Sequence, residues 1–202
     1  MTTLDSPTST DFVSILARAA ANLRTKGLRP AAKEVVNALL QAEKAAKQQR
    51  QVYPLESLYG QWRLCFTAPK NAHLKSGVAL GKGFYVPQIA PAQISFRPSQ
   101  KLGEAEITNS LQFGSLQFKL AGPARYLGKK NLLAFDFTHM ELSLFNRTIY
   151  SSGFRGGKLK ETDFYEQSIA KVPFFAFFLV TKDFIAARGR GGGLALWVNE
   201  NN

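Results

Sequence analysis

The chain has 202 residues, enough for one domain with a well-covered core, and its 45% hydrophobic and 12% aromatic content excludes a disordered protein. The formal net charge of +12 favours anionic partners, either phospholipid headgroups or nucleic acid. The single cysteine, Cys65, excludes an internal disulfide, and the widely separated His73 and His139 argue against a metal site. No run approaches the roughly 18 apolar residues of a membrane-spanning helix. The start resembles neither a secretory signal nor a transit peptide, so we expect a cytoplasmic or membrane-peripheral protein.

Two helices are predicted before residue 53. Residues 1–10 are rich in Thr and Ser and are expected to be disordered. Apolar residues at helical spacing then predict a helix from Asp11 to about Thr25, ended by Gly27. Pro30 suits the first turn of a second helix that runs to about Gln49. We expect residues 11–52 to form a helical hairpin whose apolar face packs on the next domain. A basic amphipathic element at a membrane surface is the alternative.

The periodicity changes from helical to alternating after Pro54, as in half-buried strands. Turn residues separate the alternating runs, and no helix is predicted between them. About eight or nine short strands of this kind predict an antiparallel barrel or sandwich over residues 53–202. The predicted strands cover residues 62–67, 94–97, 105–113, 116–120, 133–137, 140–144, 184–188 and 194–198.

Few residues suggest a reaction. Asp136 alternates with two phenylalanines and is expected to face solvent, and no nucleophile stands in a recognisable elbow. The glycine-rich residues 188–193 precede an alternating strand rather than a helix, so they indicate a hairpin turn and not a phosphate loop. The sequence therefore predicts no enzyme, no catalytic residue and no metal.

The most unusual segment is the Phe-rich residues 173–180, which are too short to span a bilayer. Two interpretations stay open: buried core, or a cavity mouth or membrane-dipping loop with lysines at the headgroups. On the second interpretation the membrane-contact residues are Lys171, Phe174, Phe175, Phe177, Phe178 and Lys182.

Two stretches resemble a known family. Residues 60–67, Gly-Gln-Trp-Arg-Leu-Cys-Phe-Thr, are similar to the opening strand of the plastid lipid-associated protein (fibrillin) family. Residues 181–198, with Asp183 and Arg188-Gly189 before a final apolar strand, are similar to its ending. The resemblance implies a mainly β, lipocalin-like antiparallel barrel with N-terminal α-helices. It also implies a cyanobacterial-type member that binds lipids, quinones or carotenoids at thylakoid membranes or lipid globules.

The resemblance also implies structural roles for Gly60, Trp62, Asp183, Arg188 and Gly189. Trp62 is expected to close the barrel base, with the Arg188 guanidinium packed over its ring. Asp183 is expected to hold the turn ahead of the penultimate strand.

The resulting hypothesis is a non-catalytic, protective carrier of a hydrophobic small molecule on an anionic membrane surface. It requires no cofactor, although a lipid, quinone or carotenoid is expected to be bound. The alternative is a lyase for open-chain tetrapyrroles (bilins) on a similar barrel. Nucleic-acid binding is not expected, because the aromatic residues fall on inward-facing positions. The expected cavity lining is Trp62, Leu64, Phe66, Phe96, Phe113, Phe118, Phe135 and Leu142.

Overall fold

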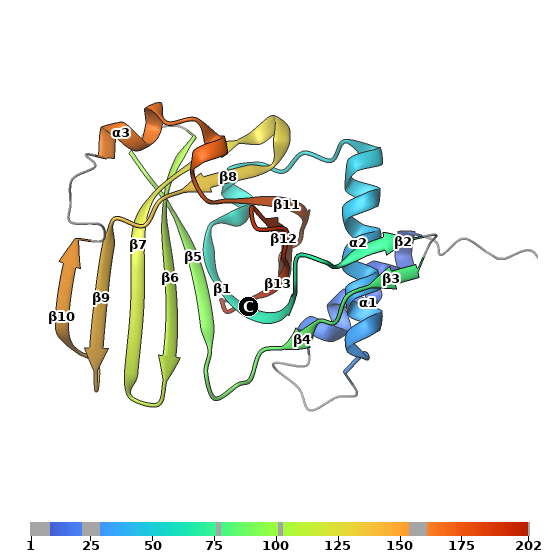
Figure 1. The fold of residues 1–202 in the computed structure, drawn as a ribbon, viewed down its shortest axis with the longest axis horizontal. Coiled ribbons are helices and arrows are strands. Elements are labelled where there is room, and N and C mark those ends of the chain that lie inside the picture. The colour runs from blue at the N-terminus through green and yellow to red at the C-terminus, as the bar shows by residue number, and fades with distance from the viewer. Residues whose placement is uncertain (1–8, 22–28, 76–77, 101–102, 154–160, 202) are drawn as a thin grey trace, which may run out of the picture.

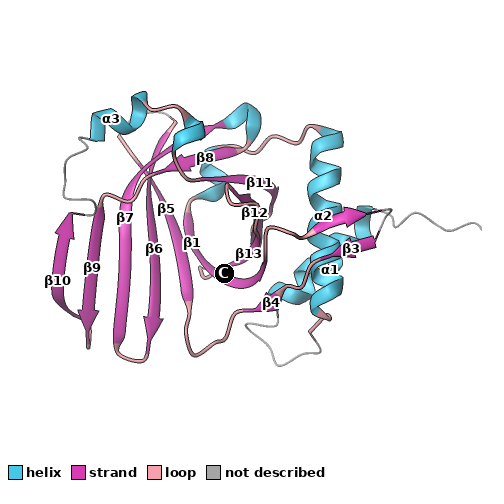
Figure 2. Cartoon of the chain, viewed as in Figure 1, coloured by secondary structure: helices cyan, strands magenta, loops and turns pink. Residues whose placement is uncertain are grey.

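The computed structural model describes residues 9–21, 29–75, 78–100, 103–153 and 161–201 and shows a mainly β protein with helices near its N-terminal end (Figures 1 and 2). Most of the expected disordered start and the expected helix end at Gly27 lie outside these residues. The described α-helices are α1 (Ser9–Ala21), α2 (Ala32–Gln49) and α3 (Glu161–Glu166). Single 3₁₀ turns are η1 (Leu55–Leu58), η2 (Gly128–Lys130) and η4 (Ile169–Lys171). The strands are β1 (Gly60–Ala68), β2 (His73–Lys75), β3 (Val78–Leu80), β4 (Phe84–Tyr85), β5 (Ala92–Pro98), β6 (Glu104–Phe113), β7 (Leu116–Leu127), β8 (Leu132–Phe135), β9 (His139–Leu144), β10 (Arg147–Gly153), β11 (Phe174–Val180), β12 (Phe184–Gly189) and β13 (Leu194–Asn199).

Eight strands close into an antiparallel barrel, in the order β7-β6-β5-β1-β13-β12-β11-β8, because β8 pairs back onto β7. The predicted fold class is therefore confirmed. The closing pair is short: only Ala124–Leu127 of β7 contacts β8. The glycine-rich turn after β12 is also a hairpin turn as predicted, with Gly192 at a φ of +88°.

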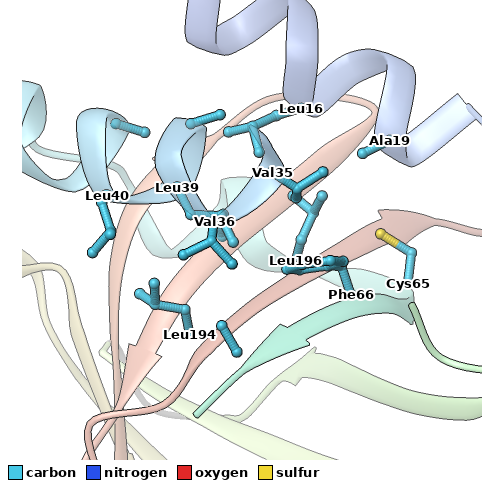
Figure 3. Close-up of a cluster of buried hydrophobic side chains, with 14 of the residues drawn as sticks. Leu16, Ala19, Val35, Val36, Leu39, Leu40, Cys65, Phe66, Leu194 and Leu196 are labelled. Atoms are coloured by element: carbon cyan, nitrogen blue, oxygen red, sulfur yellow. The ribbon is translucent and has the colours of Figure 1, made fainter. Parts of the chain in front are cut away.

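The helices α1 and α2 cover the outside of the barrel at one end (Figure 1). Their apolar faces pack on β1, β11, β12 and β13 and form with them a cluster of buried side chains. Figure 3 shows this cluster in close-up. Leu16 of α1 and Val35, Val36 and Leu39 of α2 are completely buried there. Each such side chain contributes about 1.5–3 kcal/mol when it leaves water, so the helix pair is part of the core of the domain.

A flat extension of the sheet, which we call the wing, projects from the opposite side of the barrel (Figure 1). It consists of β10, β9, residues 116–121 of β7 and residues 109–113 of β6. The wing exists because β7 changes partner along its length, from β9 to β8. Gly122 lies at the change, where an added Cβ would come within 2.0 Å of the Asp136 carbonyl oxygen. Glycine therefore permits the close crossing of the β8–β9 link.

Candidate functional site

Inward-facing side chains of the barrel strands form one buried cluster. Four residues expected to line a cavity do point inward, but they pack on one another and on η1. The indole of Trp62 donates a buried 2.7 Å hydrogen bond to the Leu58 carbonyl. The ring of Phe96 meets Phe177 edge-on, with centroids 6.0 Å apart. These four inward-facing residues are Trp62, Leu64, Phe96 and Phe135.

Phe66 lies outside the barrel and not in its lining. It is completely buried beneath α2, in the cluster of Figure 3. The register of β1 explains this position: Leu64 pairs with Trp197 while Phe66 pairs with the next residue, Leu196. This bulge adds one residue to β1, so Cys65 and Phe66 both turn toward the helices and the alternation is broken.

The remaining three expected lining residues, Phe113, Phe118 and Leu142, lie on the wing. Phe113 is 66% exposed, and the other two are half-buried. They share one face of the wing because paired residues in adjacent strands point to the same side. The rows on this face are Phe113–Leu116–Leu144–Arg147, Leu111–Phe118–Leu142–Tyr150 and Asn109–Leu120–Met140–Ser152.

The opposite face of the wing is polar. Its rows are Gln112–Gln117–Ser143–Thr148 and Ser110–Lys119–Glu141–Ser151. Hydrogen bonds join side chains of this polar face to one another, including one from the Thr148 hydroxyl to the Glu141 carboxylate at 3.1 Å. The wing is thus an amphipathic sheet. Its apolar face continues the side of β6 and β7 that carries Ile107 and Ala124 into the barrel core.

Three turns, two of the wing and one before the neighbouring strand β5, lie along the lower side of Figure 1. They are residues 86–91 before β5, residues 113–116 between β6 and β7, and residues 144–147 between β9 and β10. Backbone hydrogen bonds join them, from Phe145 N–H to Ser115 and from Gln112 N–H to Pro91, each 3.0 Å long. Ile89 and Phe145 are the most exposed large apolar residues here, at 77% and 74%. We call this part of the molecule the wing edge.

The wing edge carries almost no charge. Within residues 86–92, 111–118 and 142–149, Arg147 is the one charged residue, and none is acidic. A large exposed apolar patch on a protein marks an interaction surface, and a patch without carboxylates on a chain of net charge +12 suits an anionic partner. The sequence interpretation missed this surface because it assigned Phe113, Phe118 and Leu142 to the barrel interior.

The Phe-rich segment is a barrel strand, β11, between β8 and β12. Phe177 and Phe178 are buried, and Phe174 and Phe175 are half-buried in the wall. The interpretation of residues 173–180 as a membrane-dipping loop is therefore wrong, because its phenylalanines pack on the core. Lys171 and Lys182 are exposed at either end, and their carbonyls accept hydrogen bonds from Arg190 and Asn199, respectively.

Arg188 does not pack over Trp62. Its guanidinium makes two hydrogen bonds to the Glu43 carboxylate on α2, at 2.9 and 2.6 Å, and a third to the Gly192 carbonyl. Burial works to raise the pKa of Glu43, but hydrogen bonds and charge from Arg188 and Lys47 outweigh it and lower that pKa. Arg188 therefore anchors α2 to the barrel, a role that the alternation pattern did not indicate.

The other motif residues have backbone roles. Gly60 opens β1 with a φ of +129°, a conformation that favours glycine. The turn before β12 is held by the Thr181 side chain, which caps Phe184, and by the Asp183 carbonyl, which accepts from Asn199 N–H at 2.8 Å. Gly189 closes the glycine turn, since its N–H donates to the Gly193 carbonyl.

The described residues show little that points to catalysis or metal binding. Burial raises the pKa of the Cys65 thiol to about 12, which suppresses the reactive thiolate. No group of three His, Cys, Asp or Glu side chains among them is placed to hold a metal ion. Asp136, expected at the surface, is buried instead where the β8–β9 link crosses β7. Every described helix is too short or too polar to cross a bilayer.

No family model, curated protein or solved structure matches this chain. The resemblance to the plastid lipid-associated proteins therefore stays a prediction from the two motifs.

Proposed function

We propose that this protein is a non-catalytic lipid-binding protein that attaches peripherally to anionic membranes through the wing edge. The observation that carries the proposal is the amphipathic wing, whose apolar face and three joined turns expose Phe113, Phe145 and Ile89. Aromatic and aliphatic side chains at a bilayer interface gain free energy by leaving water, and the net charge of +12 adds attraction to anionic headgroups.

The direction of insertion follows from the geometry of the sheet. The turns point along the strands, so the edge enters the headgroup region first, and the apolar face of the wing behind it is free to cover acyl chains. Arg147, exposed at the start of β10, lies next to the inserted turns and is placed to contact a phosphate. The polar face carrying Gln117 and Lys119 stays toward water.

Vesicle flotation tests the proposal. The full chain is mixed with vesicles of phosphatidylglycerol and phosphatidylcholine, and with vesicles of phosphatidylcholine alone. We expect binding to the anionic vesicles, and about a tenfold or greater loss of binding when Phe113→Ser and Phe145→Ser are combined. Leu80→Ser, an exposed apolar change on β3 away from the wing, is the matched control and should bind like the unmodified chain.

Two outcomes would count against the proposal. Equal flotation of the double variant and the control would remove the wing edge from membrane contact. A chain that sediments as a dimer, and becomes monomeric in the double variant, would show that a second copy covers the wing.

The narrower assignment, a carrier of a lipid, quinone or carotenoid at thylakoid membranes or lipid globules, rests mainly on the two motifs. The half-buried Phe118, Leu142 and Met140 offer an apolar surface for such a molecule. Mass spectrometry of an organic extract of the protein from its native source tests this assignment, and an extract free of such molecules would reject it.

A further inference from the structure

A second apolar surface lies at the other end of the molecule, in a groove of about 480 Å³ between the end of α2, η2 and β11. We call it the α2 groove. Its apolar lining comes from Ala46, Val52, Ala176, Phe177 and Phe178. A cavity of this size is in the range that small ligands occupy in proteins.

Four cationic side chains surround the α2 groove: Lys47, Arg50, Lys129 and Lys130. Glu43 is the one carboxylate in its lining, and that carboxylate is already bound by Arg188 and by Lys47 at 3.0 Å. No described carboxylate pairs with Arg50, Lys129 or Lys130. The carbonyl ends of α2 and η2 offset part of this charge, but the groove keeps a positive potential that favours an anion.

Buried hydrogen bonds hold the wall of the groove in place. The side chain of Asn131, itself buried, accepts from Tyr53 N–H at 2.9 Å and donates to the Gln51 carbonyl at 2.6 Å. The Tyr53 hydroxyl donates to the Phe178 carbonyl, and that of Tyr126 donates to the Tyr53 carbonyl. The segment after α2 is therefore fixed before any ligand arrives, which lowers the cost of binding.

We propose that the α2 groove binds one molecule of a single-chain anionic amphiphile, with its carboxylate or phosphate head at Arg50, Lys129 and Lys130 and its chain along Val52 and Phe178. The apolar lining and the positive rim each select one half of such a molecule. This site is separate from the wing, which lies on the other side of the barrel (Figure 1), and it does not depend on membrane attachment.

Calorimetric titration of the full chain tests the site, with dodecanoate and dodecyl phosphate below the concentrations at which they form micelles. Dodecanol and inorganic phosphate are the comparison ligands. We expect one molecule of either amphiphile per chain, and much weaker binding of dodecanol and of phosphate. These four ligands separate recognition of the whole amphiphile from recognition of its head or its chain alone.

Lys129→Gln combined with Lys130→Gln should weaken amphiphile binding about tenfold or more. The matched control combines Lys33→Gln with Lys44→Gln, two exposed lysines of α2 outside the groove, and should leave binding unchanged. The variant with Phe113→Ser and Phe145→Ser should also bind normally, because its change lies on the wing. Equal binding by the two lysine variants, or dodecanol binding as tight as dodecanoate binding, would overturn the proposal.

Discussion

Replacing Arg188 with Gln tests the clamp between α2 and the barrel. The change leaves the Glu43 carboxylate, whose side chain is 12% exposed, with Lys47 as its remaining cation. Breaking a buried ion pair from one side costs about 3–5 kcal/mol. Because Lys47 and partial solvent access reduce that penalty, we expect a loss of about 2–3 kcal/mol in the free energy of unfolding at pH 7. Urea unfolding measures it.

The pH dependence of this loss follows from the sign of the Glu43 pKa shift. The folded protein holds the pKa below the ordinary value of 4.5, so the ionised carboxylate stabilises the fold above that pH. This contribution disappears as the pH falls through the folded-state pKa. The difference between the unmodified chain and Arg188→Gln should therefore narrow as the pH falls below 4.5. A difference that stays constant as the pH falls from 7 to well below 4.5 would refute the assignment.

Two further variants separate the clamp from general damage. Lys47→Gln removes the other cation of the same carboxylate, but the Lys47 side chain is 74% exposed, so its loss should cost less than about 0.5 kcal/mol. Glu43→Gln and Arg188→Gln together should cost less than the sum of the single changes by about 1–2 kcal/mol. Additive costs would mean that the two side chains stabilise the protein independently.

Two more predictions concern Gly122 and Cys65. Gly122→Ala should lower the free energy of unfolding by about 3 kcal/mol or more, or prevent folding, because its Cβ would clash with the Asp136 carbonyl. The control Gly191→Ala, with open space around the added Cβ, should change that free energy by less than about 0.5 kcal/mol. Equal melting temperatures of the two variants would contradict this account of the crossing. Because the Cys65 thiol is buried with its pKa raised to about 12, a thiol reagent at pH 8 should label it only as fast as the chain unfolds. Rapid labelling of the folded protein would show that β1 opens locally.

The barrel could be predicted from alternation and turn residues because those signals are local. The predicted strand at residues 116–120 ended at Gly122-Pro123, which usually marks a turn. In the structure β7 continues to Leu127 through this pair. Proline is tolerated at this point, where β7 changes partner and the Pro123 carbonyl accepts from Asp136 N–H. A change of partner depends on distant strands and leaves no local signal.

The face of a residue was harder to predict than its strand. Alternation along an ideal strand places every second residue on the same side, which would put Trp62, Leu64 and Phe66 together. The bulge at Cys65 reverses this after Leu64. A second bulge between Phe177 and Leu179 similarly turns Leu179 toward the helices, beside Phe178. Both bulges face the helices of the same cluster. The position of a bulge depends on the elements that the strand packs against. Counting alternate residues in the sequence therefore does not reveal it.

The candidate site illustrates a more general ambiguity of alternating strands. A strand with one apolar side has the same sequence whether that side lines a closed barrel or faces outward, and β6 and β7 do both along their length. Ile107 and Ala124 are buried where the barrel closes, whereas Leu111, Phe113 and Leu116 continue the same face into solvent. The part of β6 and β7 that extends beyond the pairing with β8 determines how much apolar surface is left exposed outside the barrel. That excess length, and not an internal cavity, is the feature from which we infer contact with lipid.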